Sequence, residues 1–212
     1  MNIEDMVQEF NKQVESLIKK GYPKAAGKTD DEFLKLIEPL KAKVSLLSLY
    51  PIDIDRGYIP FVIVIKNNLV PTEIAMNLVE KDGTHGITKL YPHEPKDFQI
   101  IEEESIPDGM VYLLADIDRG KEFINLPPNE AMEFIRNAHR HPLTIDEGVA
   151  VVTYYPEFLI KNNCFSLLAS RHTSDKRVPA IWINSKKEPN LGWCWEGNPH
   201  TWLGSASGKN RF

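Results

Sequence analysis

Cysteine is scarce in this chain. Only Cys164 and Cys194 occur among its 212 residues, and they match neither a CxxC pair nor the spacing of a zinc finger. A small secreted scaffold would use more cysteines to stabilise its fold with disulfides. We therefore expect both residues to be reduced, partly buried thiols.

Long apolar segments are also missing. The longest apolar runs, at residues 61–65 and 164–169, are far shorter than the roughly 20 residues needed to cross a bilayer. The first residues, MNIEDMVQEFNKQ, contain neither the basic stretch nor the apolar stretch of a secretion signal. We predict a cytoplasmic protein that has no membrane partner.

Common catalytic signatures are lacking as well. The sequence has no glycine-rich phosphate loop and no G-x-S-x-G elbow. The stretch VYLLADIDRG resembles the first motif of the aspartate-nucleophile phosphatases, but Gly120 stands where that family has Thr or Val. The pentapeptide DIDRG occurs at residues 53–57 and 116–120. We interpret the two copies as coincidence or as similar turns, and not as a fold repeat.

The net charge of −5 is distributed unevenly along the chain. Residues 161–212 hold eight Lys or Arg and three acidic residues, a net charge of +5, whereas residues 1–160 hold 17 and 27, a net charge of −10. A basic C-terminal third can bind an anion or a protein partner. The acidic total disfavours direct nucleic-acid binding.

The N-terminal part predicts two helices. Apolar residues recur at helical spacing after Asn2, a suitable N-cap, and Gly21 provides a stop. Thr29 and Glu32 form a capping box for the second helix, which Pro39 must bend or end. We expect residues 1–47 to form a helical segment that packs against a sheet-containing body at residues 60–212.

The rest of the chain mixes strand and helix patterns. Buried strands are predicted at residues 61–65 and 110–117, and shorter ones near 87–90 and 98–101. Helices are predicted from Pro71, within PPNEAMEFIRNAHR and after the capping box Thr144–Glu147. The expected inward side of the middle helix comprises Ala131, Phe134, Ile135 and Ala138.

The last third predicts an antiparallel meander formed by CFSLLAS, AIWIN and LGWCWEG. In a meander the strands of Cys164 and Cys194 flank the central strand, about 9–10 Å apart, which is too far for a disulfide. The fold class is therefore α+β: a mixed sheet with a C-terminal antiparallel meander and an N-terminal helical pair packed against it. We expect one domain over residues 1–212.

Two further sequence patterns bear on whether the chain binds a metal or uses a thiol. His139 and His141 form an H-x-H pair, but zinc would need a third ligand such as His172, His200 or Asp175, and a solvated basic helix end explains the pair better. We expect no metal and no cofactor. Cys194 with His200 could supply a nucleophile and a base, although a buried structural thiol is commoner.

Three longer stretches carry a family resemblance: PLTIDEGVAVV, CFSLLASRHTSDKRVPAIWI and, above all, LGWCWEGNPHTWLGSAS. They resemble an uncharacterised family of bacterial cytoplasmic proteins, a domain of unknown function, and the likeness extends over nearly the whole chain. The resemblance implies a bacterial, cytoplasmic protein. It implies no reaction, cofactor or catalytic residue.

We predict a site within residues 164–207, a region that contains the tryptophan-rich segment at residues 192–204. Its leading function is binding of a small planar or anionic ligand, or of a protein partner. The alternatives are a hydrolase that uses His200 as general acid/base, a weak nucleic-acid binder, and a tryptophan-rich core edge with no site. Because Trp193 and Trp195 alternate with Cys194, we expect the tryptophans to be largely buried. The candidate ligand-binding residues are Arg171, Arg177, Trp193, Trp195, Asn198, His200 and Trp202.

Overall fold

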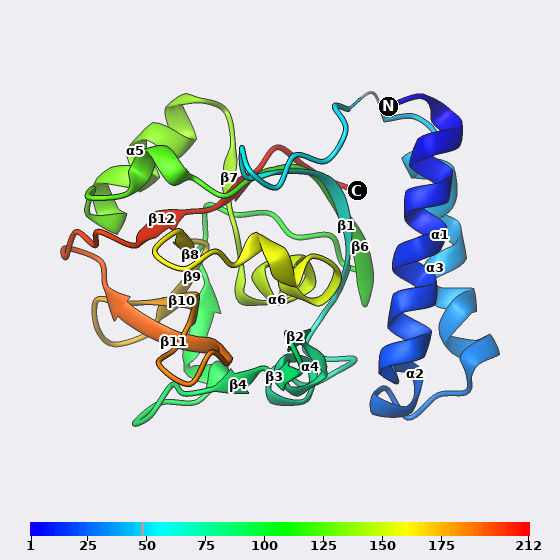
Figure 1. Cartoon of the computed structure of the whole chain (residues 1–212), viewed down its shortest axis with the longest axis horizontal. Coiled ribbons are helices and arrows are strands. Elements are labelled where there is room, and N and C mark those ends of the chain that lie inside the picture. The colour runs from blue at the N-terminus through cyan, green and yellow to red at the C-terminus, as the bar shows by residue number, and fades with distance from the viewer. Residues whose placement is uncertain (48) are drawn as a thin grey trace.

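The computed structural model describes residues 1–47 and 49–212, and its elements form successive layers (Figure 1). Helices α1 and α3 cover one face of a sheet that contains β1 and β6, and α6 lies on the other face of that sheet. A second sheet, which contains β8, β10 and β11, packs on the far side of α6. The α+β class predicted from the sequence is confirmed, whereas the single-domain division stays a prediction.

The N-terminal helical segment comprises α1 (Ile3–Lys20), α2 (Tyr22–Ala25) and α3 (Asp30–Val44). The predicted caps are present: the Asn2 side chain accepts from the Asp5 amide, and Gly21 ends α1 in the left-handed conformation, with φ of 84°. Thr29 forms the predicted capping box with Glu32. Each cap satisfies backbone groups that the helix itself leaves without a partner.

Pro39 does not end α3, which was one of the two outcomes predicted for it. The helix continues to Val44. Pro39 and Lys35 lie on the exposed side of α3, so the Lys35 carbonyl that loses its helical partner can bind water instead. Exposure of this side of the helix therefore limits the cost of the missing hydrogen bond.

The first sheet has the strand order β1 (Tyr58–Ile65), β6 (Val111–Asp118), β13 (Ser207–Gly208) and β7 (His141–Pro142), and β14 (Asn210–Arg211) also pairs with β6. Strands β1 and β6 are antiparallel, with Tyr58 opposite Asp118. This register brings the two DIDRG segments together, and the Arg119 amide donates to the Gly57 carbonyl at 2.9 Å. Gly57 and Gly120 are both left-handed, with φ of 86° and 70°, so the two segments end in similar turns.

Helix α6 (Ile145–Tyr154) is buried between the two sheets. The Thr144–Glu147 capping box begins it as predicted. Gly148 allows close contact with the second sheet, because a Cβ there would lie 2.4 Å from Leu167 Cδ2. A helix that is covered on both sides needs apolar residues around its circumference, which explains the run from Val149 to Val152.

The second sheet has the order β12 (Leu203–Ser205), β8 (Cys164–Ser166), β10 (Arg177–Ile183), β11 (Pro189–Trp195) and β4 (Ile87–Thr88). Strands β8, β10 and β11 form the predicted antiparallel meander, and β4 and β12 add parallel pairs at its edges. Cys164 and Cys194 lie on the strands that flank β10, and both are free and buried. The free-thiol prediction is therefore confirmed.

Shorter elements connect these layers. The predicted strands near residues 87–90 and 98–101 are present as β4 and β5, and the helix after Pro71 is α4. Among described residues, no helix has the length and hydropathy needed to cross a bilayer. The remaining elements are α4 (Thr72–Leu78), β2 (Glu80–Lys81), β3 (Thr84–His85), η1 (Pro95–Asp97), β5 (Phe98–Ile100), η2 (Lys121–Phe123), α5 (Pro128–Asn137), η3 (Pro156–Phe158) and β9 (Ser170–His172).

Two of the four residues expected on the inward side of α5 are exposed. Ala131 and Ile135 are buried, but Phe134 is 57% exposed and Ala138 is also exposed. Met132 takes the inward position instead. The buried side therefore comprises Pro128, Ala131, Met132 and Ile135, and Phe134 lies beside Phe123 at the surface.

Candidate functional site

The seven predicted site residues do not lie together in the structure. Arg177, Trp193 and Trp195 come together and form what we call the Arg–Trp surface. His200 and Trp202 contact each other elsewhere, with their rings 5.4 Å apart. The predicted residues therefore do not line one continuous pocket.

The Arg–Trp surface lies where β10 begins and β11 ends. Arg177 is opposite Trp195 in the strand register. Its guanidinium carbon lies 4.3 Å from the Trp193 ring centre and 4.5 Å from that of Trp195. The two indoles are 5.5 Å apart and nearly perpendicular, at 76°. Such contacts combine cation–π attraction with aromatic edge-to-face packing.

Asp175 holds Arg177 in this position. Its Oδ1 accepts from the Arg177 amide at 2.9 Å, and its Oδ2 forms an ion pair with Arg177 Nη1. On the other side, Trp193 Nε1 donates to the Tyr91 carbonyl at 3.2 Å. The guanidinium is thus fixed by both charge and stacking, and its positive charge is already partly balanced.

The expected burial of the tryptophans was wrong. Cys194 is 6% exposed, whereas Trp195 is 40% exposed and Trp193 is only partly buried. Cys194 lies opposite Val178 and its Sγ is 3.8 Å from Ser166 Oγ, so its side of the sheet accommodates a small side chain. Burial raises the pKa of Cys194 to about 11, which disfavours the thiolate that a nucleophile needs.

His200 belongs to a second aromatic group. Its ring packs on Trp202, which in turn lies 5.7 Å from Trp182 in an edge-on arrangement. His200 Nε2 is buried without a hydrogen-bond partner, and burial lowers the pKa of this imidazole. The neutral ring is therefore favoured at neutral pH.

Arg171 and Asn198 lie outside both aromatic groups. Arg171 is on β9, opposite Gln99 of β5, and its Nη1 is buried without a hydrogen-bond partner. Burial lowers the pKa of Arg171. Asn198 is exposed, and its backbone amide donates to the Trp195 carbonyl at 3.2 Å in the turn that follows β11.

Sequence reasoning missed a group that we call the histidine triad, formed by His93, Asp97 and His172. Each residue offers one possible metal-ligand atom, and these atoms lie within 4.8 Å of one another. The two imidazole centres are 4.0 Å apart. The sequence pattern relates His172 to zinc only as a possible third ligand beside His139 and His141. The single local signal was the H-x-x-x-D spacing of His93 and Asp97.

Strand pairing builds the histidine triad from distant parts of the chain. Strand β5 pairs with β9 so that Phe98 lies opposite His172, and Asp97 directly precedes Phe98. The Thr173 amide donates to the Asp97 carbonyl at 3.1 Å. Burial, followed by the neighbouring His172 and Arg177, lowers the pKa of His93. That shift favours the neutral imidazole.

A hollow of about 550 Å³, which we call the Tyr91 hollow, adjoins the triad. His93 belongs to both, and the carbonyl of Tyr91 links the hollow to Trp193. Triad, hollow and Arg–Trp surface are therefore neighbours. The hollow is lined by Glu73, Thr88, Lys89, Leu90, Tyr91, Pro92, His93, Glu94 and Pro95.

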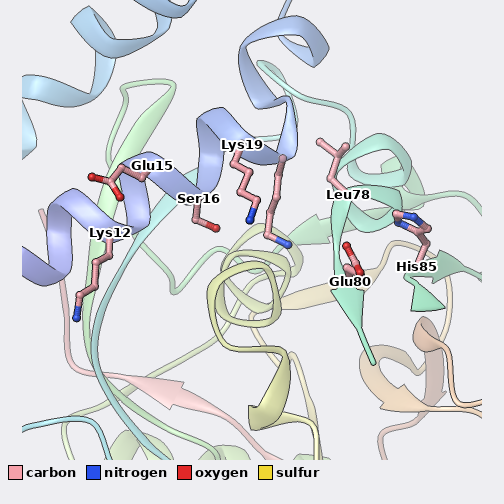
Figure 2. A pocket seen from close by; sticks show the side chains of 8 residues that line it. Lys12, Glu15, Ser16, Lys19, Leu78, Glu80 and His85 are labelled. Carbon is pink, nitrogen blue, oxygen red and sulfur yellow. The ribbon is translucent and has the colours of Figure 1, made fainter. Parts of the chain in front are cut away.

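Two other hollows have different chemistry. One, of about 560 Å³, lies between α1 and the α4–β3 region, where Lys19 of α1 points into the space in front of Glu80 and His85 (Figure 2). The second, of about 490 Å³, contains His139 and His141.

The H-x-H pair has an ionic partner of its own. His141 Nδ1 lies 3.0 Å from Glu104 Oε2. Within the part of the chain that the structure describes, the residues gathered closely enough to share a metal are those of the histidine triad. The zinc arrangement considered from the sequence, with His139 and His141 as ligands, is therefore not assembled.

Fold and site together define an α+β protein with a partly exposed arginine–tryptophan cluster beside two close histidines. The chain belongs to DUF5701, a family of unknown function, through residues 16–212. No curated protein and no solved structure matched it. The resemblance to a family of unknown function is thus confirmed, while the bacterial and cytoplasmic assignments stay predictions.

Proposed function

We propose that this protein binds a planar group, carried by a small molecule or by a partner protein, on the Arg–Trp surface. The observation that carries the proposal is the guanidinium of Arg177 in contact with two indoles, of which Trp195 is 40% exposed. The exposed part of the Trp195 indole, held in place by the guanidinium of Arg177, offers a flat surface for stacking. Trp, Tyr and Arg are also the residues most enriched at binding hot spots.

The surroundings favour a planar group over a simple anion. Asp175 already pairs with Arg177, and Glu196 lies 3.8 Å from Lys176. An incoming phosphate would have to compete with these carboxylates. Tyr91, which is 88% exposed, adds an aromatic residue whose backbone carbonyl accepts from Trp193 Nε1. Stacking should therefore contribute more than charge, and the same argument disfavours binding to a nucleic-acid backbone.

The test compares AMP, adenosine and inorganic phosphate as probes, with the indole N–H signals of the four tryptophans followed by NMR. We expect AMP and adenosine to shift the Trp193 and Trp195 signals, and phosphate alone to leave them in place. Trp195→Ser should weaken adenosine binding at least tenfold, about 1.4 kcal/mol. Phe134→Ser, which removes another exposed aromatic ring, is the matched control. Shifts confined to Trp182 and Trp202 would contradict the proposal.

The alternative of a hydrolase based on His200 has less support. A general base needs a hydrogen-bonded partner or an open path to the proton that it removes. His200 Nε2 is instead buried and partnerless beside Trp202. A hydrolytic activity that disappears in His200→Ala but survives in Trp195→Ser would favour this alternative.

A further inference from the structure

We propose that His93, Asp97 and His172 bind a divalent transition-metal ion, with zinc as its representative. This inference goes beyond the proposed stacking function and does not depend on it. Two imidazoles and one carboxylate are a donor set that zinc and other first-row metals accept. Three protein ligands leave at least one coordination position for water or a substrate atom.

The positions of the donor atoms support this site. One nitrogen from each histidine and one oxygen from Asp97 lie within 4.8 Å of one another. A zinc ion bonds to nitrogen and oxygen at about 2.0–2.2 Å, so modest side-chain rotations bring the three atoms to coordination distance. The β5–β9 pairing and the hydrogen bond from the Thr173 amide to the Asp97 carbonyl hold the backbones of Asp97 and His172 beside each other.

A buried histidine nitrogen without a hydrogen-bond partner also supports a bound metal ion. His93 Nε2 is buried and has no hydrogen-bond partner. Leaving such an atom without a partner is unfavourable, and nearly all buried polar atoms have one. A metal ion bound to Nε2 would satisfy it, and the neutral imidazole is the form that can coordinate.

Neighbouring groups orient the ligands. The Ser174 amide donates to His172 Nδ1 at 3.3 Å and Asp175 Oδ1 lies 3.2 Å from the same nitrogen, so the other ring nitrogen, Nε2, remains for a metal. A carboxylate behind a metal-binding histidine is the usual arrangement, because it fixes the ring and strengthens the ligand. The Glu94 amide donates to Asp97 Oδ2 at 2.9 Å and restrains the carboxylate in the same way.

The local charge also suits a cation. Asp97 and Asp175 provide two negative charges next to the histidines, and Arg177 provides one positive charge. The guanidinium is turned toward Asp175 and the two indoles. The Tyr91 hollow reaches His93 and provides a route by which water or a substrate could approach the open coordination position.

The experiment uses the full chain, stripped with a chelator, then titrated with zinc by calorimetry and with cobalt by absorption spectroscopy. We expect one ion per chain and cobalt bands typical of nitrogen and oxygen ligands. His93→Gln and His172→Gln should each weaken zinc binding at least 100-fold. Asp175→Asn, which alters the group behind His172 and also the ionic partner of Arg177, should weaken it about 10- to 100-fold.

The matched controls are His139→Gln and His141→Gln, which alter the H-x-H pair and should leave the affinity unchanged. Circular dichroism checks that each variant is folded. If a triad variant does not fold, zinc-induced shifts of the His93 and His172 ring signals in the wild type provide the same test. The proposal is overturned if wild-type protein binds no zinc at micromolar concentration, or if binding depends on His139 or His141 instead of the triad.

Discussion

At the scale of single residues, environment decides chemistry more than residue type does. Cys194 and Trp195 are neighbours on one strand, yet the thiol is 6% exposed and the indole is 40% exposed. The alternation of side chains along β11 was predicted correctly, but the side that accepts the bulky residues was not. Arg177 explains the difference, because its stem and guanidinium give the indoles a surface to pack on outside the core.

Asp146 carries the clearest consequence for pH. Burial raises the pKa of its carboxyl group to about 6, although the Asn67 amide donates to Oδ2 at 3.1 Å. The folded state therefore holds this proton more tightly than the unfolded chain, in which the pKa is about 3.9. The contribution of Asp146 to stability is complete below pH ~4 and is lost as the pH rises through about 6.

We predict that Asp146→Asn is more stable than the wild type at pH 8, by on the order of 1–3 kcal/mol, and gains little at pH 4. Part of the gain is offset because Asp146 lies in the first turn of α6, where a negative charge interacts well with the helix dipole. Urea unfolding at the two pH values measures the difference. Asp108→Asn, at an exposed position, is the control. An equal effect at both pH values would show that charge burial is not the cause.

At the scale of elements, most of the fold could be predicted from the sequence because its signals are local. Capping residues mark the starts of α1, α3 and α6, and β-branched runs mark β1 and β10. The histidine triad could not be predicted in this way. His93 and His172 meet only because β5 pairs with β9, and nothing near either histidine specifies that pairing. Among the candidate site residues, only Arg177, Trp193 and Trp195 are brought together as a group of three.

Gly148 illustrates how tightly α6 packs on the second sheet. Alanine at this position would favour the helix by roughly 1 kcal/mol. Its Cβ, however, would lie 2.4 Å from Leu167 Cδ2 and 3.1 Å from Leu167 Cγ in a fully buried environment. Overpacking of this kind costs about 1–3 kcal/mol, so we predict a net loss of stability in Gly148→Ala.

Thermal or urea unfolding measures that loss, and a double-mutant cycle with Leu167→Ala identifies its origin. The two substitutions should partly compensate, because the smaller side chain makes room for the new methyl group. Gly197→Ala is the control, since no atom lies within 4 Å of a Cβ built there. Strictly additive effects at Gly148 and Leu167 would contradict this account of the contact.

At the scale of the whole molecule, Gln13 connects the helical segment to the sheet-containing body. Its side chain is 2% exposed and replaces a neighbouring strand at the edge of β1. Gln13 Nε2 donates to the Phe61 carbonyl at 2.9 Å, and the Ile63 amide donates to Gln13 Oε1 at 2.9 Å. Tyr155, at the end of α6, joins this group by accepting from Nε2 at 3.0 Å. One residue thus links three layers of the fold.

Gln13→Ala would leave the Phe61 carbonyl and the Ile63 amide buried without partners, which costs about 1–3 kcal/mol for each unsatisfied group. We therefore predict a loss of at least about 2 kcal/mol in urea unfolding, together with faster hydrogen exchange at the Ile63 amide. Lys12→Ala is the control, because this neighbouring side chain is 72% exposed. If residues 1–47 and 60–212 form one domain, both should unfold in a single transition in the wild type. If the Ile63 amide stays protected in Gln13→Ala, Gln13 is not what closes the edge of β1. In that case the contacts of α1 and α3 with the sheet must hold the helical segment in place without it.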